Sequence, residues 1–243
     1  MKAIEIKNLT KRYKELVAVD KLNLSVEKGE LFALLGVNGA GKTTTMKMLS
    51  CLVQPDEGDA VLLGDSVKTA PMKVKEKINI SPQETAVAPN LSVRENLELI
   101  CGIYGHNKSE ARKRTDKILE EFHLGEIEKQ KAKTLSGGWQ RRLSIAMALI
   151  TEPQILFLDE PTLGLDVLAR RELWEVIEQL KGKMTIILTT HYLEEAEALS
   201  DHIGIMTKGH LVALGTAEEL KEQAGKEEFE EAFVELCKRG GVV

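Results

Sequence analysis

The octapeptide GVNGAGKT at residues 36–43 constrains the fold of this chain more than any other part of its sequence. It matches the pattern G-x-x-x-x-G-K-[ST], whose glycines let the backbone wrap closely around an anion. The apolar run LFALL precedes it and TTTMKMLSCL follows it, which is the strand–loop–helix setting the pattern requires. A glycine-rich turn that only caps a helix is the alternative, and this setting disfavours it. The motif therefore predicts a phosphate-binding loop between a strand and a helix.

The chemistry of this loop follows from its residue types. Its backbone amides and the N-terminus of the following helix would face phosphate groups. Lys42 would neutralise the β- and γ-phosphates, and the Thr43 hydroxyl would ligate Mg²⁺. We therefore expect nucleotide contacts from this set of loop residues: Gly36, Asn38, Gly39, Ala40, Gly41, Lys42, Thr43 and Thr44.

Short apolar runs along the chain predict the fold class. Four of them lack strict alternation, as is typical of parallel strands covered on both faces: 31–35, 78–80, 155–158 and 184–189. Two others, at 3–9 and 22–27, alternate and predict half-exposed antiparallel strands. We expect an α/β fold with a parallel sheet around the phosphate loop and an antiparallel β subdomain near the N-terminus.

The middle of the chain is expected to be helical. No strand is indicated between Leu91 and Lys133, whereas Ser92 and Glu95 have capping-box spacing. A second helix is expected to start near Ser109. The apolar faces predicted for the two helices are Leu97, Ile100, Ile103 and Tyr104 on the first, and Ala111, Thr115, Ile118, Leu119 and Phe122 on the second.

These patterns predict one domain over residues 1–243 with an inserted α-helical subdomain. Its parts are a catalytic α/β core at 1–83 and 136–215, the helical insert at 84–135, and a C-terminal helical tail at 216–243.

Composition excludes several classes of protein. The 33 basic and 38 acidic residues give a net charge of −5, which argues against a surface that binds duplex nucleic acid. Aromatic residues make up 4%, too few for a stacking platform for single strands, so no nucleic-acid partner is expected. Three scattered cysteines indicate a reducing compartment. No apolar run approaches the ~20 residues of a membrane span, so we expect a chain that does not cross a membrane.

The segment ILFLDEP at 155–161 ends a buried strand in two adjacent acids. Acids in this position lie beside the phosphate loop in doubly wound sheets. Asp159 would hold Mg²⁺ directly or through water, and Glu160 would polarise the attacking water. Two carboxylates in a solvated turn are the alternative, which the neighbouring phosphate loop disfavours.

The sequence LSGGWQRRLSIAMAL, which begins at Leu135, decides between families. Ser136 is suited to cap a helix, and Gly137 and Gly138 leave backbone amides open at its start, which makes a second anion site. With this segment the chain closely resembles the nucleotide-binding subunits of ATP-binding cassette (ABC) transporters. The resemblance implies that ATP is the nucleotide. It also implies a head-to-tail pair of chains, expected to be a homodimer, in which Ser136 and Gly138 of one close over the nucleotide held by the other.

The resemblance assigns roles to further positions. Tyr13 matches the aromatic residue that stacks on adenine, and Gln83 the glutamine that senses Mg²⁺ and the γ-phosphate. Asp166 ends LGLD, which resembles the loop that crosses to the partner chain. His191 matches the switch histidine that contacts the γ-phosphate and positions water. Each of these residues, taken singly, would more often be structural.

Two positions depart from the family pattern. Trp139 stands where glutamine, methionine or glutamate is more usual, and Leu163 where a small residue is. These departures bear on the packing of the signature helix, which is the helix expected to follow Ser136 in LSGGWQRRLSIAMAL, and on the geometry of the cross-subunit loop LGLD. Neither removes a catalytic group.

The resemblance implies an ATPase that drives transport through an integral membrane permease on a separate chain. Residues 84–134 would receive a coupling helix of the permease, which places the chain peripherally on the cytoplasmic face of the cell membrane. The C-terminal segments look like those of bacterial drug, antibiotic or sodium exporters, and an amino-acid importer subunit is the alternative. A non-transport ABC ATPase is a further alternative, although such proteins generally carry coiled coils, zinc modules or tandem cassettes. An unrelated phosphate-loop kinase would leave LSGG and His191 unexplained.

Overall fold

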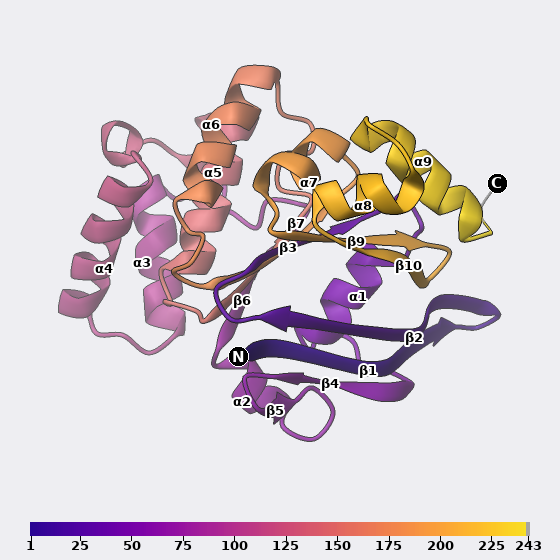
Figure 1. The fold of residues 1–243 in the computed structure, drawn as a ribbon. Helices are drawn as coiled ribbons and strands as arrows, with labels where there is room; N and C mark the ends of the chain where they lie inside the picture. The colour runs from indigo at the N-terminus through magenta and orange to yellow at the C-terminus, as the bar shows by residue number, and fades with distance from the viewer. Residues whose placement is uncertain (242–243) are drawn as a thin grey trace.

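The computed structural model describes residues 1–241 and contains two β-sheets, with helices packed on both faces of the larger one (Figure 1). The larger sheet has the strand order β10-β9-β3-β8-β7-β6, and only β10 runs antiparallel to its neighbour. Its strands are β3 (Leu31–Leu35), β6 (Ile78–Ser81), β7 (Ile155–Asp159), β8 (Thr185–Thr190), β9 (His202–Thr207) and β10 (His210–Gly215). The four predicted parallel strands are therefore confirmed to within about one residue.

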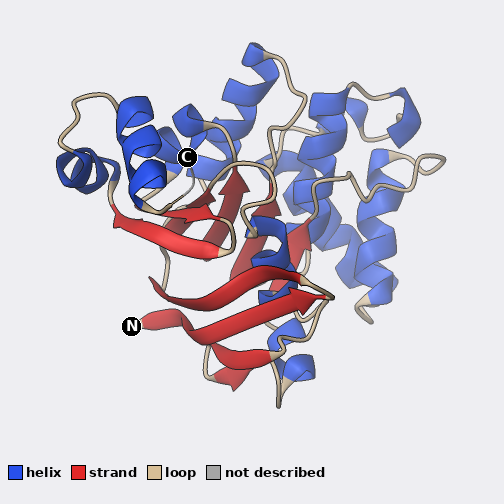
Figure 2. Ribbon diagram, turned by 90° about the vertical axis from the view of Figure 1, so that its right-hand side faces the viewer, coloured by secondary structure: helices blue, strands red, loops and turns tan. Residues whose placement is uncertain are grey.

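The smaller sheet is antiparallel and has the order β2-β1-β4-β5. It consists of β1 (Lys2–Tyr13), β2 (Leu16–Glu27), β4 (Glu57–Leu62) and β5 (Asp65–Ser66). The two alternating segments predicted from the sequence form β1 and β2, which extend beyond the predicted bounds as one long hairpin. The strands β4, β9 and β10 were not predicted from the sequence. Figure 2 shows this sheet packed below the parallel one, with α1 (Lys42–Leu49) between them.

Within residues 1–241, seven more helices of five residues or longer follow α1 and α2 (Pro71–Lys75). They are α3 (Val93–Ile103), α4 (Lys108–Glu121), α5 (Gly137–Leu149), α6 (Val167–Glu178), α7 (Leu193–Leu199), α8 (Ala217–Ala224) and α9 (Phe229–Arg239). The predicted capping box of α3 is present, since Ser92 Oγ accepts from Glu95 N and Glu95 Oε2 accepts from Ser92 N. Helix α4 begins one residue earlier than expected, because Asn107 caps it through hydrogen bonds from two backbone amides. The last two residues of the predicted C-terminal tail, 242 and 243, lie outside the described residues.

The predicted apolar face of α3 is wrong in its second half. Leu97 is fully buried, but Ile103 is 67% exposed and Tyr104 is 48% exposed. The buried face instead includes Asn96, whose side chain bonds the backbone of residues 88–92. The reason is that apolar spacing marks a helical stripe but does not show how far along the helix its neighbours reach. On α4 the predicted face is buried as expected.

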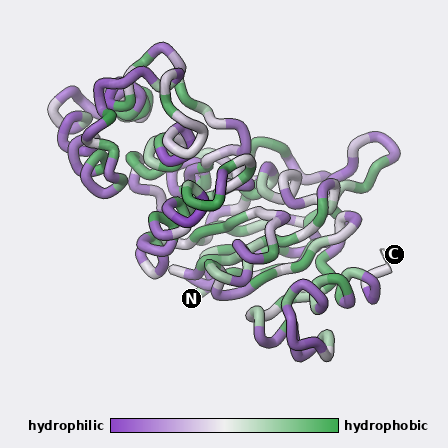
Figure 3. Tube along the Cα trace, turned by 90° about the horizontal axis from the view of Figure 1, so that it is seen from above, coloured by the Kyte–Doolittle hydropathy of each residue, from purple (hydrophilic) through white to green (hydrophobic). Residues whose placement is uncertain are grey.

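In the described part of the chain, three apolar clusters hold the structure together. The largest joins the inner faces of α3, α4 and α5 to one face of β7 and β8, so the helical insert shares its core with the parallel sheet. A second lies between the antiparallel sheet, α1 and the other face of the parallel sheet, and a third packs α7, α8 and α9 on β3, β9 and β10. In Figure 3 the central strands are mostly green and the outer helical turns mostly purple, as this arrangement requires.

No helix within residues 1–241 is both long and apolar enough to span a bilayer.

Candidate nucleotide-binding and catalytic site

The loop between β3 and α1 has a backbone path that only glycine allows at two positions. Gly41 has φ +105°, and a Cβ there would lie 2.5 Å from the carbonyl oxygen of Ala18. A Cβ on Gly36 would lie 2.4 Å from the carbonyl oxygen of Met206. Both distances are too short for a side chain, so the glycines permit the tight turn that brings the loop amides and the start of α1 to one point.

Lys42 lies at the centre of this loop. Its Nζ donates to the carbonyl oxygens of Gly36 at 2.7 Å and Val37 at 3.3 Å, and lies 3.6 Å from Glu160 Oε1. Burial lowers the pKa of Lys42, and the carboxylates of Glu160 and Asp159 oppose that shift. The loop therefore holds a buried cation where phosphate oxygens are expected.

The two acids that follow β7 face the loop from the neighbouring strand. Asp159 Oδ1 accepts hydrogen bonds from Thr43 Oγ1 at 3.3 Å and from the Thr189 hydroxyl of β8. Glu160 adopts a left-handed backbone with φ +47°, and its N–H donates to both Oγ1 and the carbonyl oxygen of Thr189. That conformation is unusual for a residue with a side chain. The two acids have different partners, since the Glu160 carboxylate lies near Lys42 whereas that of Asp159 bonds Thr43.

Glu160 also contacts His191, which follows β8. Glu160 Oε2 lies 2.9 Å from His191 Nδ1, and both acids are buried, with 4% of Asp159 and 7% of Glu160 exposed. A buried carboxylate beside an imidazole is suited to accept a proton from water. Thr43 and Asp159 offer a hydroxyl and a carboxylate at one place, which are oxygen ligands of the kind that Mg²⁺ prefers.

The predicted adenine and phosphate contacts share one cavity of about 680 Å³. Tyr13, 44% exposed at the end of β1, lies on its rim, and Gln83, just after β6, lines it too. Its lining also includes the predicted residues Asn38, Gly39, Ala40, Gly41, Lys42, Thr43, Thr44 and Glu160. Gly36, Asp159 and His191 lie next to this lining and contact it through Lys42, Thr43 and Glu160.

The signature residues are placed elsewhere. Ser136 caps α5, accepting a hydrogen bond from Trp139 N at 3.5 Å, while Gly137 is exposed and Gly138 half-buried. Asp166 caps α6 through hydrogen bonds from Leu168 N and Ala169 N, both at 3.0 Å. None of these side chains lines the nucleotide cavity of its own chain. Their roles in nucleotide binding stay predictions that require a second chain.

Arg141 is a residue near this site that the sequence analysis missed. It lies on α5, is 4% exposed, and donates to the carbonyl oxygens of Pro82, at 2.5 Å, and Gln83. It therefore ties the signature helix to the backbone of the predicted Mg²⁺ sensor. The one signal in the sequence was a pair of arginines inside an otherwise apolar helix. That signal does not show which residues the arginines would contact.

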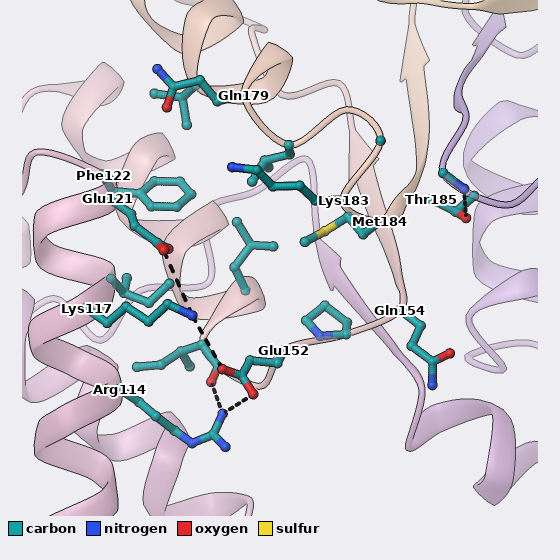
Figure 4. Close-up of a pocket in the computed structure, with 18 of the residues that line it drawn as sticks. Arg114, Lys117, Glu121, Phe122, Glu152, Gln154, Gln179, Lys183, Met184 and Thr185 are labelled. Carbon is teal, nitrogen blue, oxygen red and sulfur yellow. Dashed lines mark hydrogen bonds and ion pairs between the residues drawn. The ribbon is translucent and has the colours of Figure 1, made fainter.

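Another cavity, larger than the nucleotide cavity, lies away from this site. It measures about 810 Å³ and includes Gly29, Gln154 and Thr185, which stand at or just before the amino ends of β3, β7 and β8. The phosphate loop follows the carboxyl end of β3. Figure 4 shows the side chains that line the 810 Å³ cavity, where Lys117 lies between Glu121 and Glu152. These rim charges pair with one another, so this cavity offers no catalytic constellation.

Among residues 1–241 no group of three or more His, Cys, Asp and Glu side chains stands ready to hold a metal alone. A Mg²⁺ ion bound by Thr43 and Asp159 would have to complete its coordination with phosphate oxygens and water. The glycine loop, the buried Lys42 and the two acids that face them define the molecule as a phosphate-loop nucleoside triphosphatase.

Comparison with known proteins narrows this class to one family. The model of the ABC transporter family matches residues 19–163, and the chain belongs to this family. The doxorubicin resistance ATP-binding protein DrrA of Mycobacterium tuberculosis is 42% identical over 240 residues, which cover 98% of this chain and 71% of DrrA. The linearmycin resistance ATP-binding protein LnrL of Bacillus subtilis is 42% identical over 223 residues, covering 91% of this chain and 72% of LnrL.

One of the similar solved structures contains the products of ATP hydrolysis. The dimeric ATP-binding cassette MJ0796, in a post-hydrolysis state bound to ADP and Pi, superposes with a TM-score of 0.79 at 28% identity. The match covers 88% of this chain and 98% of that one. The present chain is therefore an ATP-binding subunit that hydrolyses ATP.

Proposed function

We propose that the chain drives export of a drug-like or antibiotic molecule through a separate permease, using Mg²⁺-ATP bound between two copies of itself. The observation that supports a pair of chains is that the two anion sites of one chain, the phosphate loop and the N-terminus of α5, lie apart. The phosphate loop and Glu160 share one cavity, while the capped N-terminus of α5 presents its amides outside that cavity. A second copy placed head to tail would bring the two sites to one γ-phosphate.

The chain's own residues suggest how hydrolysis proceeds. Lys42 stabilises negative charge on the phosphates, and Thr43 and Asp159 hold Mg²⁺, which would neutralise further charge when bound. Glu160 orients the attacking water and accepts its proton, aided by His191 at 2.9 Å. Tyr13 lies where it could stack on adenine at the rim of the cavity.

A surface on the helical insert supports a permease partner. Leu99, Ile103 and Tyr104 of α3 and its C-cap are 44%, 67% and 48% exposed, which is a large apolar area for one short helix. Next to them a small cavity is lined by Pro82, Ile80 and other residues beside the Gln83 loop. A permease helix docked here would contact the segment that carries the predicted γ-phosphate sensor. This position at the membrane would be peripheral, on its cytoplasmic face.

The named relatives favour export over amino-acid import. DrrA and LnrL both carry resistance to an antibiotic or drug in their names. They support the same direction and the same broad class of cargo for this chain, whose cargo would be selected by the permease.

Glu160→Gln tests the paired arrangement. The change keeps the size of the side chain but removes its ability to accept a proton, so we expect ATP binding to persist and turnover to fall by ~10²-fold or more. The trapped ATP should hold two chains together, which sizing chromatography with ATP and Mg²⁺ would detect as a dimer.

Glu222→Gln is the matched control, because Glu222 is an exposed residue of α8. We expect it to turn over ATP as the unaltered protein does and to show no lasting dimer. A monomeric Glu160→Gln variant in saturating ATP would contradict the paired site. Unchanged turnover in that variant would contradict the role of Glu160.

A further inference from the structure

Glu195 is a buried carboxylate that the site described above does not use. It lies on α7, four residues after His191, and is 0% exposed. Its Oε1 accepts a hydrogen bond from the indole Nε1 of Trp174 on α6 at 3.1 Å. Isolated buried carboxylates are costly, and an apolar side chain would serve packing alone better. The position of Glu195 therefore calls for a role beyond packing.

Unpartnered polar atoms gather around this carboxyl group. Within residues 1–241, the buried side-chain atoms that lack a hydrogen-bond partner include Glu195 Oε2, Thr162 Oγ1 and Arg170 Nε. Such atoms are few in native structures, and a cluster of them requires an explanation. The Thr162 hydroxyl and the Arg170 guanidinium both lie close enough to Glu195 to act on its carboxyl group.

These atoms come from the segments that flank the hydrolytic site. Thr162 follows Glu160 by two residues and precedes the LGLD loop. Arg170 lies on α6, and its guanidinium lies 4.9 Å from the ring centre of Tyr192. The Tyr192 ring lies 4.3 Å from the ring of His191. The carboxyl group of Glu195 thus stands between the loop after Glu160 and the segment that carries His191.

The electrostatics agree with this placement. Burial raises the pKa of Glu195, while the nearby hydroxyls of Thr190 and Thr162, the indole of Trp174 and the charge of Arg170 oppose the rise. Thr190 directly precedes His191, and its Oγ1 accepts from Tyr192 N at 2.9 Å. Groups from α6, from the loop after Glu160 and from the residue before His191 therefore all act on this one carboxyl group.

We propose that Glu195 is a positioning residue, which fixes the loop carrying Thr162 relative to His191 and so sets the place of His191 beside Glu160. Its anchor is the Trp174 indole, which holds α7 against α6. Without the carboxyl group, the Trp174 indole loses its acceptor on α7 and Thr162 loses the carboxyl group beside it, so the contact between His191 and Glu160 loses support. The proposal rests on the hydrolytic roles proposed above for Glu160 and His191.

The first test replaces the pair by apolar side chains of similar size in the variant Trp174→Phe with Glu195→Leu. Removing both partners together leaves neither the indole donor nor the carboxyl acceptor unpaired at this contact, so thermal unfolding should stay near that of the unaltered protein. We expect kcat for ATP hydrolysis to fall by about tenfold or more, because displacement of a reacting group by ~1 Å can cost ~10²-fold. The KM for ATP should stay within twofold, since neither residue lines the nucleotide cavity. An unchanged kcat, or a rise in KM that matches the fall in kcat, would overturn the proposal.

Two single variants complete the test without relying on the double one. Glu195→Gln keeps an acceptor for Trp174 and gains a donor that can reach Thr162, so we expect kcat within about threefold of the unaltered value. Thr162→Val keeps the shape of a fully buried side chain, and we expect it to lower kcat several-fold at constant KM. A Glu195→Gln variant as slow as the double variant, or a Thr162→Val variant at full rate, would count against a hydrogen-bonding role.

The matched control is Glu197→Gln on the same helix, where the side chain is 43% exposed and lies 3.7 Å from Lys221. We expect it to leave kcat and KM unchanged. Glu160→Gln, assayed in parallel, separates this inference from the proposed function. If only the Glu195 variants keep full turnover, the positioning role fails alone; if Glu160→Gln keeps it too, the proposed hydrolytic site fails.

Discussion

At the scale of single residues, Lys42 shows how burial adapts a common side chain to phosphate binding. Its ammonium is 4% exposed and is held by carbonyl oxygens of the loop and by Glu160. Burial that lowers the pKa of a lysine signals a charge kept partly desolvated. A phosphate group that replaces those weaker partners would meet an ammonium that interacts more strongly than one in water.

Lys42→Ala should therefore weaken ATP binding by about tenfold or more, because a charge-assisted hydrogen bond to phosphate contributes roughly 1.5–3 kcal/mol. The variant should fold, since the loop conformation depends on the glycines at 36 and 41 rather than on the lysine. A titration with a fluorescent ATP analogue measures the affinity, with Lys47→Ala as the control on the same helix. Equal affinity for the Lys42 variant and the control would show that the loop does not bind the phosphates.

At the scale of elements, the start of α3 depends on one buried amide. Asn96 is 0% exposed, and its side chain donates to the carbonyl oxygens of Ala88, Leu91 and Ser92 while Oδ1 accepts from Ala88 N at 2.7 Å. These bonds fold residues 88–92 back onto the helix that they precede. This segment follows Gln83, so its rigidity fixes how the loop of the predicted Mg²⁺ sensor joins the helical insert.

Asn96→Ala should destabilise the protein by about 2–3 kcal/mol, because it leaves buried backbone groups without partners and opens a small cavity. Urea unfolding followed by circular dichroism measures the change. Asn90→Ala is the matched control, since Asn90 is exposed and accepts a single bond from Lys133 Nζ at 3.1 Å. A destabilisation no greater than that of the control would mean that other contacts hold residues 88–92.

At the scale of the whole molecule, the Gln83 loop reaches both the nucleotide cavity and a small cavity beside the apolar surface of the insert. Gln83 lines the nucleotide cavity, and the neighbouring Pro82 lines the small cavity beside Tyr104. Arg141 of the signature helix donates to the carbonyl oxygens of both residues. One short loop thus connects the nucleotide, the signature helix and the surface proposed to bind a permease.

Ile103→Asp should weaken association with a co-expressed permease by about tenfold, because a charge placed in an apolar contact costs at least ~1.4 kcal/mol. ATP hydrolysis by the isolated chain should be unchanged, since Ile103 is 67% exposed and does not line the nucleotide cavity. Co-purification from detergent-solubilised membranes measures the effect, with Val234→Asp on α9 as the control. Full retention of the permease by the Ile103 variant would place its docking surface elsewhere.

The sequence by itself determined the parts of this protein that depend on local spacing. The glycine spacing of 36–43, the strand that precedes it and the capping box of α3 are set within a few residues, so they could be predicted and are found in place. Motif order also predicted which residues belong to the nucleotide site. That Tyr13 and Gln83 share a cavity with the phosphate loop, however, follows from contacts between strands far apart in the chain.

Only the tertiary structure decided the features that depend on what lies opposite a residue. Apolar spacing on α3 could not show that its last turn is exposed, because exposure depends on how far α4 and α5 extend. The strands β9 and β10 and the buried groups Arg141 and Glu195 were missed for the same reason. Burial and hydrogen bonding of such residues arise between segments brought together by folding, and no local pattern encodes those partners.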